Sequence, residues 1–174
     1  MTMQRYSRKA QIQTQLFTYI MILVVSAGIL VFGYNAISGF KKDADNVIYL
    51  KFETRLKNDF KSLSYGSIRQ NVYDLPSAVE EVCFKGADAV YADVVRDNPN
   101  KLLIASAIGA DGTGTSNNVF IYPKGDKALF TGISLDVDET STDAIKFKCF
   151  KVNSGVLKIT VKGQGKSVLV TGSK

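Results

Sequence analysis

Two cysteines, Cys83 and Cys149, are the residues of this sequence with the most distinctive chemistry. In an oxidising compartment they can form a disulfide, which would contribute about 3–4 kcal/mol in the chain-entropy model because it closes a long loop. The alternative is two separate buried thiols that pack as small hydrophobic groups. Cys149 shares a strand face with Phe147, whereas Cys83 alternates with apolar Val82 and Phe84. We expect the disulfide, with an edge position or a β-bulge reconciling the two faces.

Lysines dominate the end of the chain. From Ala144 onward the sequence has seven lysines and no acidic residue, within a total net charge of +6. They could line one sheet face that binds a polyanion such as DNA, an anionic surface polymer or lipid headgroups. We favour the alternative that they keep the sheet soluble and protect its edges from aggregation. The candidate polyanion face consists of Lys146, Lys148, Lys158 and Lys162.

The other groups of residues that could carry chemistry give only weak signals of a site. Four acids cluster between two predicted strands, and a calcium loop is conceivable there, but their spacing matches no EF-hand and favours a solvated turn. The stretch Gly163–Ser167 resembles a phosphate-binding loop, yet it lies between two strands and predicts a hairpin turn. The chain has no histidine, which removes the commonest general base and metal ligand. We therefore expect no enzymatic activity, no metal, no cofactor and no small-molecule ligand. The clustered acids are Asp136, Asp138, Glu139 and Asp143.

An apolar run near the N-terminus determines where the domain that carries these residues lies relative to a membrane. Leu16 to Ile37 contains no charged residue. Its length is about the twenty residues that a helix needs to cross a bilayer, and it exceeds a typical secretory signal core. We predict a retained transmembrane helix over residues 11–39. Arg5, Arg8 and Lys9 precede it, which favours an N-terminus inside and a following domain outside the cytoplasm.

Beyond the apolar run, hydrophobic residues recur at spacings of three and four over residues 40–63. This is the pattern of an amphipathic helix with one apolar stripe. The sequence therefore predicts one long helix from near Gln11 to near Ser62, whose second half packs on a domain. The stripe consists of Phe40, Ala44, Val47, Ile48, Phe52, Leu56, Phe60 and Leu63.

Residues 64–174 carry mostly β signals. Alternation is clearest near the end of the chain, and turn residues separate the segments. Pro99 predicts a helix through Ile108, with Asp97 or Asn98 as its cap and Gly109 as its end, and residues 87–95 are a weaker helix prediction. Residues 110–118 form a loop by composition. We expect an α+β protein whose β domain is an antiparallel sheet or sandwich of about seven strands. The predicted strands are 68–73, 79–84, 119–122, 128–137, 145–149, 155–161 and 167–171, the last three as a meander.

The N-terminal stretch resembles a known signal sequence. Lys9-Ala10, followed by Gln11-Ile12-Gln13-Thr14-Gln15 and the apolar run, is similar to the class III signal of archaeal type IV pilin-like proteins. The tract from Arg8 to Gly39 also looks like uncharacterised membrane-anchored proteins of archaea with small genomes. The resemblance implies that a prepilin-type peptidase cuts between Ala10 and Gln11, that the helix is retained, and that a β-rich head follows it. Many pilins carry a glutamate early in the mature chain, and this sequence has none there.

These features predict a cytoplasmic leader over residues 1–10 and a single-pass, pilin-like cell-surface protein without enzymatic activity. Its β domain would act in filament assembly or adhesion. The helix would contact the bilayer, or other copies of the chain in an extracellular filament. Two alternatives remain open: an anchored envelope protein that does not polymerise, and a membrane-tethered module that binds a polyanion.

Overall fold

The computed structural model describes residues 7–123, 128–137 and 146–172, with side chains described from Gln15 onward except that of Asp97. Its first element is helix α1, Ser7–Lys61, which is 55 residues long. The helix begins a few residues before the predicted start near Gln11 and ends within one residue of the predicted end. The chain divides into two compact units, Met1–Ala44 and Asp45–Lys174, so the boundary falls inside α1. We call the second unit the β domain.

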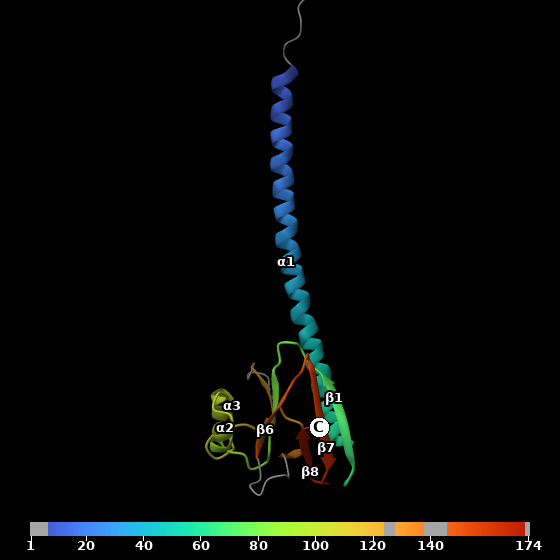
Figure 1. Ribbon diagram of the computed structural model, residues 1–174, viewed down its shortest axis with the longest axis vertical. Coiled ribbons are helices and arrows are strands. Elements are labelled where there is room, and N and C mark those ends of the chain that lie inside the picture. Colours follow the sequence, from blue (N-terminus) through green and yellow to red (C-terminus); the bar gives the residue numbers. More distant parts are fainter. Residues whose placement is uncertain (1–6, 124–127, 138–145, 173–174) are drawn as a thin grey trace, which may run out of the picture. The chain divides into compact units, whose positions relative to one another are not determined.

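The described part of the β domain contains two four-stranded sheets (Figure 1). The first sheet has the order β1-β7-β8-β5, and the second has the order β4-β3-β2-β6. All pairs are antiparallel except β5 with β8, which is parallel. The α+β class is confirmed, and the purely antiparallel arrangement is wrong. The strands are β1 Ile68–Asp74, β2 Glu81–Lys85, β3 Val119–Tyr122, β4 Ala128–Leu129, β5 Ser134–Val137, β6 Phe147–Lys151, β7 Val156–Gly163 and β8 Ser167–Gly172.

The segment 128–137, predicted as one strand, is two strands in different sheets. Between them Gly132 has a φ of 77° and Thr131 turns inward, with only 1% of its surface exposed. The Thr131 N–H donates to Asn118 Oδ1 at 3.0 Å, and Asn118 Nδ2 donates to the Ile133 carbonyl at 2.8 Å. These hydrogen bonds hold the chain where it crosses from the second sheet to the first.

The predicted meander of the last three strands is also wrong. β7 and β8 form an antiparallel hairpin, but β6 pairs with β2 in the second sheet. After β6 the chain turns through Ser154 and Gly155, both with positive φ, and then enters β7. All three segments are strands, but burial alternates with period two only along β7. Alternation carries no information about which strand is the neighbour.

The main hydrophobic core is built from both sheets and the end of α1. Phe52, Leu56 and Phe60 are at most 2% exposed and belong to the same buried cluster as strand residues of both sheets. The predicted stripe is therefore buried from Phe52 to Phe60 and partly buried at Leu63, whereas Val47 is half exposed. This burial makes residues 45–61 of α1 part of the β domain.

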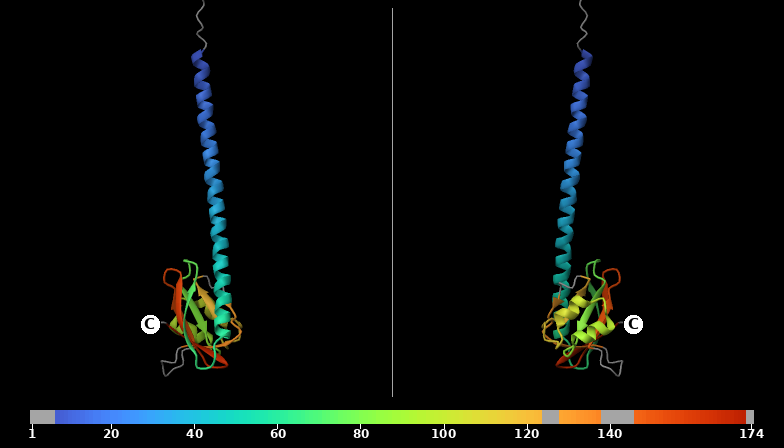
Figure 2. Two further views of the ribbon diagram at one scale, coloured as in Figure 1. Left: turned by 90° about the vertical axis from the view of Figure 1, so that its right-hand side faces the viewer. Right: turned by 90° about the vertical axis from the view of Figure 1, so that its left-hand side faces the viewer.

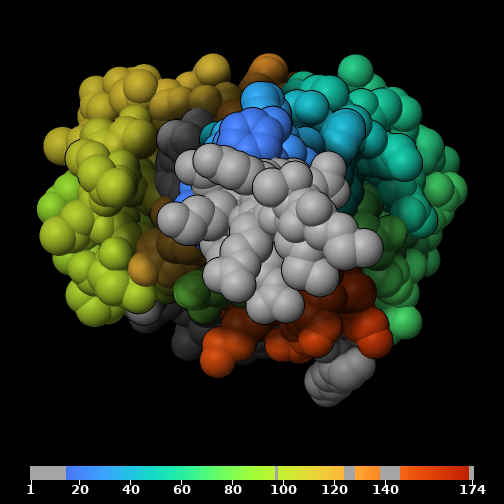
Figure 3. Space-filling model, turned by 90° about the horizontal axis from the view of Figure 1, so that it is seen from above, coloured from blue at the N-terminus to red at the C-terminus, as the bar shows by residue number. Residues whose placement is uncertain are grey.

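A second buried cluster covers the other face of the second sheet. It includes Phe120 and Phe147 together with helices α2, Tyr91–Asp97, and α3, Leu102–Ile108. The two helices pack side by side (Figure 2). Within the β domain they lie on the side opposite to β1 (Figure 3). α3 begins after Lys101 rather than after Asp97 or Asn98, and it ends at Gly109 as predicted.

Candidate functional site

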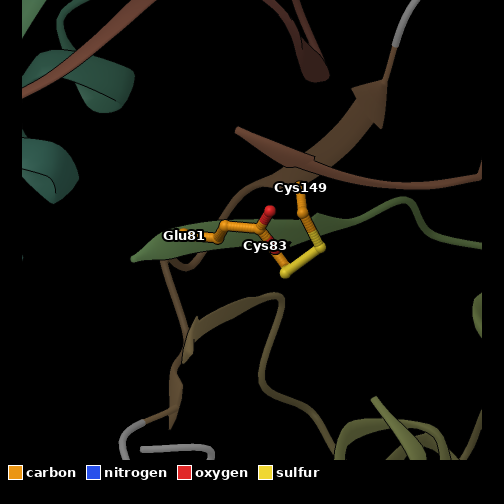
Figure 4. Close-up of side chains that lie close together, drawn as sticks. All are labelled: Glu81, Cys83 and Cys149. Carbon is orange, nitrogen blue, oxygen red and sulfur yellow. A yellow bond between two sulfur atoms is a disulfide. The ribbon is translucent and has the colours of Figure 1, made fainter. Parts of the chain in front are cut away.

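The structure joins Cys83 and Cys149 in a disulfide with an S–S distance of 2.01 Å (Figure 4). The two residues are direct partners in the antiparallel register of β2 and β6, and their Cα atoms are 3.9 Å apart. Such close spacing is typical of a non-hydrogen-bonded pair. The register of β2 with β6 is continuous, without a bulge, and Cys149 lies in β6, which is an edge strand of the second sheet, so one of the two expected arrangements is present. Because the second sheet is covered on both faces, Val82 and Phe84 enter the main core while Cys83 enters the second cluster.

Glu81 lies beside the disulfide, on the same face of β2 as Cys83 (Figure 4). Its carboxylate and the two cysteine sulfurs are within 4.8 Å of one another, a grouping that would suit a metal ion if the thiols were free. Both sulfurs are bonded to each other, however, and no cysteine is free. The Glu81 carboxylate is engaged as well, because Lys101 Nζ lies 2.6 Å from Oε2. The group is therefore a structural cross-link next to an ion pair.

Lys101 is a buried lysine that the sequence analysis did not single out. It is 4% exposed, and its ammonium has three kinds of partner. Besides the Glu81 carboxylate, Nζ donates to Asn98 Oδ1 at 3.2 Å and lies 4.8 Å from the ring centroid of Tyr122. These contacts balance the desolvation of the charge. A lysine at a helix start gives no sequence signal of burial, since most lysines are solvated.

The four lysines of the candidate polyanion face do not share one sheet face. Lys148 lies in β6 of the second sheet, with Lys146 immediately before that strand. Lys158 and Lys162 alternate with buried residues along β7 of the first sheet. The single face was predicted from a meander that does not form. Only the β7 pair remains together.

The other candidate groups are partly outside the described residues. Asp136 lies in β5 and accepts a hydrogen bond from Ser167 Oγ at 2.5 Å. Asp138, Glu139 and Asp143 lie outside the described residues, so the acidic cluster has no structural description. The turn at Gly163–Ser167 is a hairpin turn, as predicted, closed by the Gln164 N–H donating to the Ser167 carbonyl at 2.9 Å.

The processing junction lies within helix α1. The backbone of Lys9, Ala10 and Gln11 is helical, and their side chains are outside the described part of the chain. Residues 1–6, which complete the predicted leader, are also outside it. The junction therefore stays a prediction from the sequence pattern.

The apolar part of α1 is exposed on all sides. From Leu16 to Ile37 its large hydrophobic side chains are about half to four-fifths exposed, with Leu30 at 73% and Phe32 at 78%. The described residues contain one helix long and apolar enough to cross a membrane, Gln15–Lys61. Glycine positions Gly28 and Gly33 leave the helix surface open, with nothing within 4 Å of an added Cβ.

An open groove of about 780 Å³ lies in the β domain between α1 and the end of β1. Its polar floor is a hydrogen-bonded group in which Tyr73 Oη donates to Asp59 Oδ2 at 2.9 Å and Asn71 Nδ2 donates to Tyr73 Oη at 2.9 Å. Burial, and then the hydrogen bond to Asp59, raise the pKa of the Tyr73 phenol well above its ordinary value. These groups satisfy one another's hydrogen bonds and join α1 to β1.

Comparisons of the chain with protein-family models, with curated proteins and with solved structures give no match.

Proposed function

We propose that this chain is a single-pass, membrane-anchored surface protein of the pilin-like type, without enzymatic activity, whose β domain acts through contacts in assembly or adhesion. The observation that carries the proposal is the exposed apolar surface of α1 between Leu16 and Ile37. Nothing in the chain's described residues covers that surface. The partner of this helix is therefore expected to be lipid or other apolar helices.

The magnitude of the exposed surface supports this expectation. Burying one large hydrophobic side chain is worth about 1.5–3 kcal/mol. More than a dozen such side chains are exposed along this helix, so the total is tens of kcal/mol, which exceeds the stability of about 5–15 kcal/mol of a typical domain. A helix of this kind in water would associate or aggregate. In a bilayer its backbone is satisfied and its side chains are solvated by lipid.

Two further features bear on the side of the membrane that the β domain would occupy. Basic residues Arg5, Arg8 and Lys9 precede the helix, which favours an N-terminus on the cytoplasmic side. The Cys83–Cys149 disulfide suits an oxidising compartment. Both support a β domain outside the cytoplasm.

The pilin-like assignment rests on the resemblance at Lys9-Ala10-Gln11 and on the order of a long helix followed by a β domain. A prepilin-type peptidase would release residues 1–10 and leave the apolar helix to pack with other copies. The alternative is an anchored envelope protein that keeps its leader and does not polymerise. A polyanion-binding module has less support, because the four candidate lysines are divided between two sheets.

The mature N-terminus distinguishes the first two functions. Intact-mass spectrometry of the protein from membranes that contain a prepilin-type peptidase should show a chain that begins at Gln11. Lys9→Ala should block this cleavage and leave membrane insertion unchanged. A wild-type chain that keeps residues 1–10 would contradict the pilin-like proposal and leave the plain anchor.

Membrane anchoring is tested separately. The wild-type protein should resist extraction from membranes by alkaline carbonate. The double variant Leu23→Lys, Val24→Lys should be released, because a charge at the bilayer centre opposes insertion by about 3 kcal/mol per residue. The matched control is Leu103→Lys, since Leu103 is 78% exposed in the β domain, and it should stay anchored. Release of the wild-type protein would contradict the proposal.

A further inference from the structure

Lys85 is the second buried lysine of the β domain, and its surroundings differ from those of Lys101. Lys85 ends strand β2 and is 8% exposed. Its Nζ donates to the carbonyl of Gly112 at 3.0 Å. Lys101, by contrast, has a carboxylate, an amide and an aromatic ring around its ammonium. Among the described residues, Lys85 Nζ has only a neutral acceptor.

A buried ammonium with one neutral acceptor carries an uncompensated desolvation penalty, which folded proteins normally offset with a counter-charge. The nearest acid along the chain from Gly112 is Asp111, and its carboxylate is already bound. It accepts from the Thr113 N–H at 3.0 Å and from Thr113 Oγ1 at 2.8 Å. The hydrogen bond from the Thr113 N–H, and then the one from Thr113 Oγ1, lower the pKa of Asp111.

Lys85 also lines a cavity of about 290 Å³. The cavity lies between the end of β2, the loop that follows α3, and the segment that crosses from β4 to β5. Three hydroxyl side chains line it, those of Thr115, Ser116 and Ser134, and none of its described lining residues is acidic. Thr115 Oγ1 accepts a hydrogen bond from the Asn117 N–H at 3.1 Å, so its own O–H remains a donor.

We propose that this cavity is a binding site for a small tetrahedral oxyanion of the phosphate or sulfate class, with the Lys85 ammonium as its counter-charge. The hydroxyls of Thr115, Ser116 and Ser134 supply neutral donors around the same space. A charge-assisted hydrogen bond from an ammonium to an oxyanion is about twice as strong as a neutral one. The bound anion would supply a counter-charge that none of the described residues gives to Lys85.

The cavity has a volume of about 290 Å³. This is close to the lower end of the range of about 300–1,000 Å³ that is typical of small-molecule sites, so the cavity has room for an inorganic anion or for a phosphoryl or sulfuryl group. The site goes beyond the proposed membrane function and does not depend on it.

The experiment uses the full-length protein in detergent micelles, with sodium phosphate as the probe and sodium chloride at matched ionic strength as the reference. Phosphate should raise the thermal midpoint of the β domain in a saturable manner. Lys85→Met should weaken phosphate binding about tenfold or more, because it removes the one charged donor among the described residues that line the cavity. Lys158→Met, which removes an exposed lysine, should bind phosphate as the wild-type protein does.

A second arm keeps the proposal testable if Lys85→Met does not fold. The double variant Ser116→Ala, Ser134→Ala retains the charge and should also weaken binding, while phosphate should shift the NMR amide signals of Gly86 and Gly112 in the wild-type chain. Sulfate should compete with phosphate, and acetate should not. The proposal is overturned if phosphate gives no saturable change, if Lys85→Met and Lys158→Met respond alike, or if acetate binds as well as phosphate.

Discussion

Tyr73 connects β1 to helix α1 through a phenol group that is almost completely buried. Its side chain is 1% exposed and its ring packs edge-on against Phe52, with centroids 5.6 Å apart. The hydroxyl donates to Asp59 of α1 and accepts from Asn71. A single residue therefore combines core packing with a polar contact between helix and sheet. Removing only its oxygen separates these two contributions.

Tyr73→Phe should lower the free energy of unfolding by about 1–2 kcal/mol at neutral pH, because Asp59 and Asn71 lose a buried partner. Tyr65→Phe is the matched control, since Tyr65 is 84% exposed, and it should change stability little. Denaturant titration of the two variants measures both values. Equal effects would show that the Asp59 contact contributes nothing.

The same phenol makes the β domain sensitive to alkaline pH. The pKa of Tyr73 is raised by burial and by Asp59, so the folded state retains its proton above pH 10, where an unfolded tyrosine loses it. The contribution of Tyr73 is complete below about pH 10 and decreases as the pH rises toward the folded-state pKa. Unfolding midpoints measured at increasing alkaline pH should therefore fall more steeply for the wild-type protein than for Tyr73→Phe. Parallel curves would contradict this prediction.

The disulfide is the second feature to test at the scale of residues. Cys83 and Cys149 are separated by 66 positions, and closing a loop of that length restricts the unfolded chain by about 4 kcal/mol in the chain-entropy model. The variant Cys83→Ala, Cys149→Ala should lose stability of this order. Comparison with the reduced wild-type protein separates the lost bond from the lost side-chain volume. Unchanged stability after reduction would show that strand pairing alone sets the stability.

At the scale of elements, the last turns of α1 behave as a component of the β domain. Leu56 is 0% exposed, whereas Leu50 on the same helix is 63% exposed. Leu56→Ala should therefore destabilise the domain by about 2–5 kcal/mol. Leu50→Ala should cost less than about 0.5 kcal/mol, because it removes little buried surface. The two substitutions change helix propensity by the same amount, so the difference between their thermal unfolding midpoints reports packing alone. Similar effects of the two variants would contradict the assignment of the end of α1 to the core.

The elements could largely be predicted from the sequence, but their partners could not. Periodicity predicted α1 and β7 closely, because burial on one face leaves a repeating pattern in the chain. Short apolar runs bounded by turn residues predicted β1, β3 and β8. The break inside 128–137 was missed, since a short apolar stretch does not show where Gly132 turns it. The pairing of β6 with β2 and of β5 with β8 depends on contacts between distant segments.

For the candidate sites too, the sequence predicts local features but not contacts between distant segments. The cysteine pair could be predicted, because two cysteines allow only one intramolecular bond. The lysine face could not, since it required the order of strands in the sheets. Lys85 and Lys101 have no sequence signal, because their burial arises from loops and helices that meet only after folding.

At the scale of the whole molecule, the first sheet depends on its last strand. β8 lies between β7 and β5 and buries Val168, Leu169 and Val170. These three side chains are together worth about 5–9 kcal/mol, which is comparable to the full stability of a typical domain. Truncation after Lys166 should therefore abolish the protease resistance of the β domain. Truncation after Gly172 is the control and should leave that resistance intact, and a stable shorter chain would contradict the prediction.

The position of β8 also determines when the protein can fold during its biosynthesis. The first sheet cannot close until the final strand has left the ribosome, whichever side of the membrane the domain finally occupies. Before β8 is synthesised, β5 has no strand to pair with, and β1 can pair only once β7 is present. The side chains of Phe52, Leu56 and Phe60 then have no completed sheet to cover them. The nascent chain would therefore present an adhesive helix surface throughout its synthesis. Until β8 is complete, that surface is open to association with other apolar surfaces.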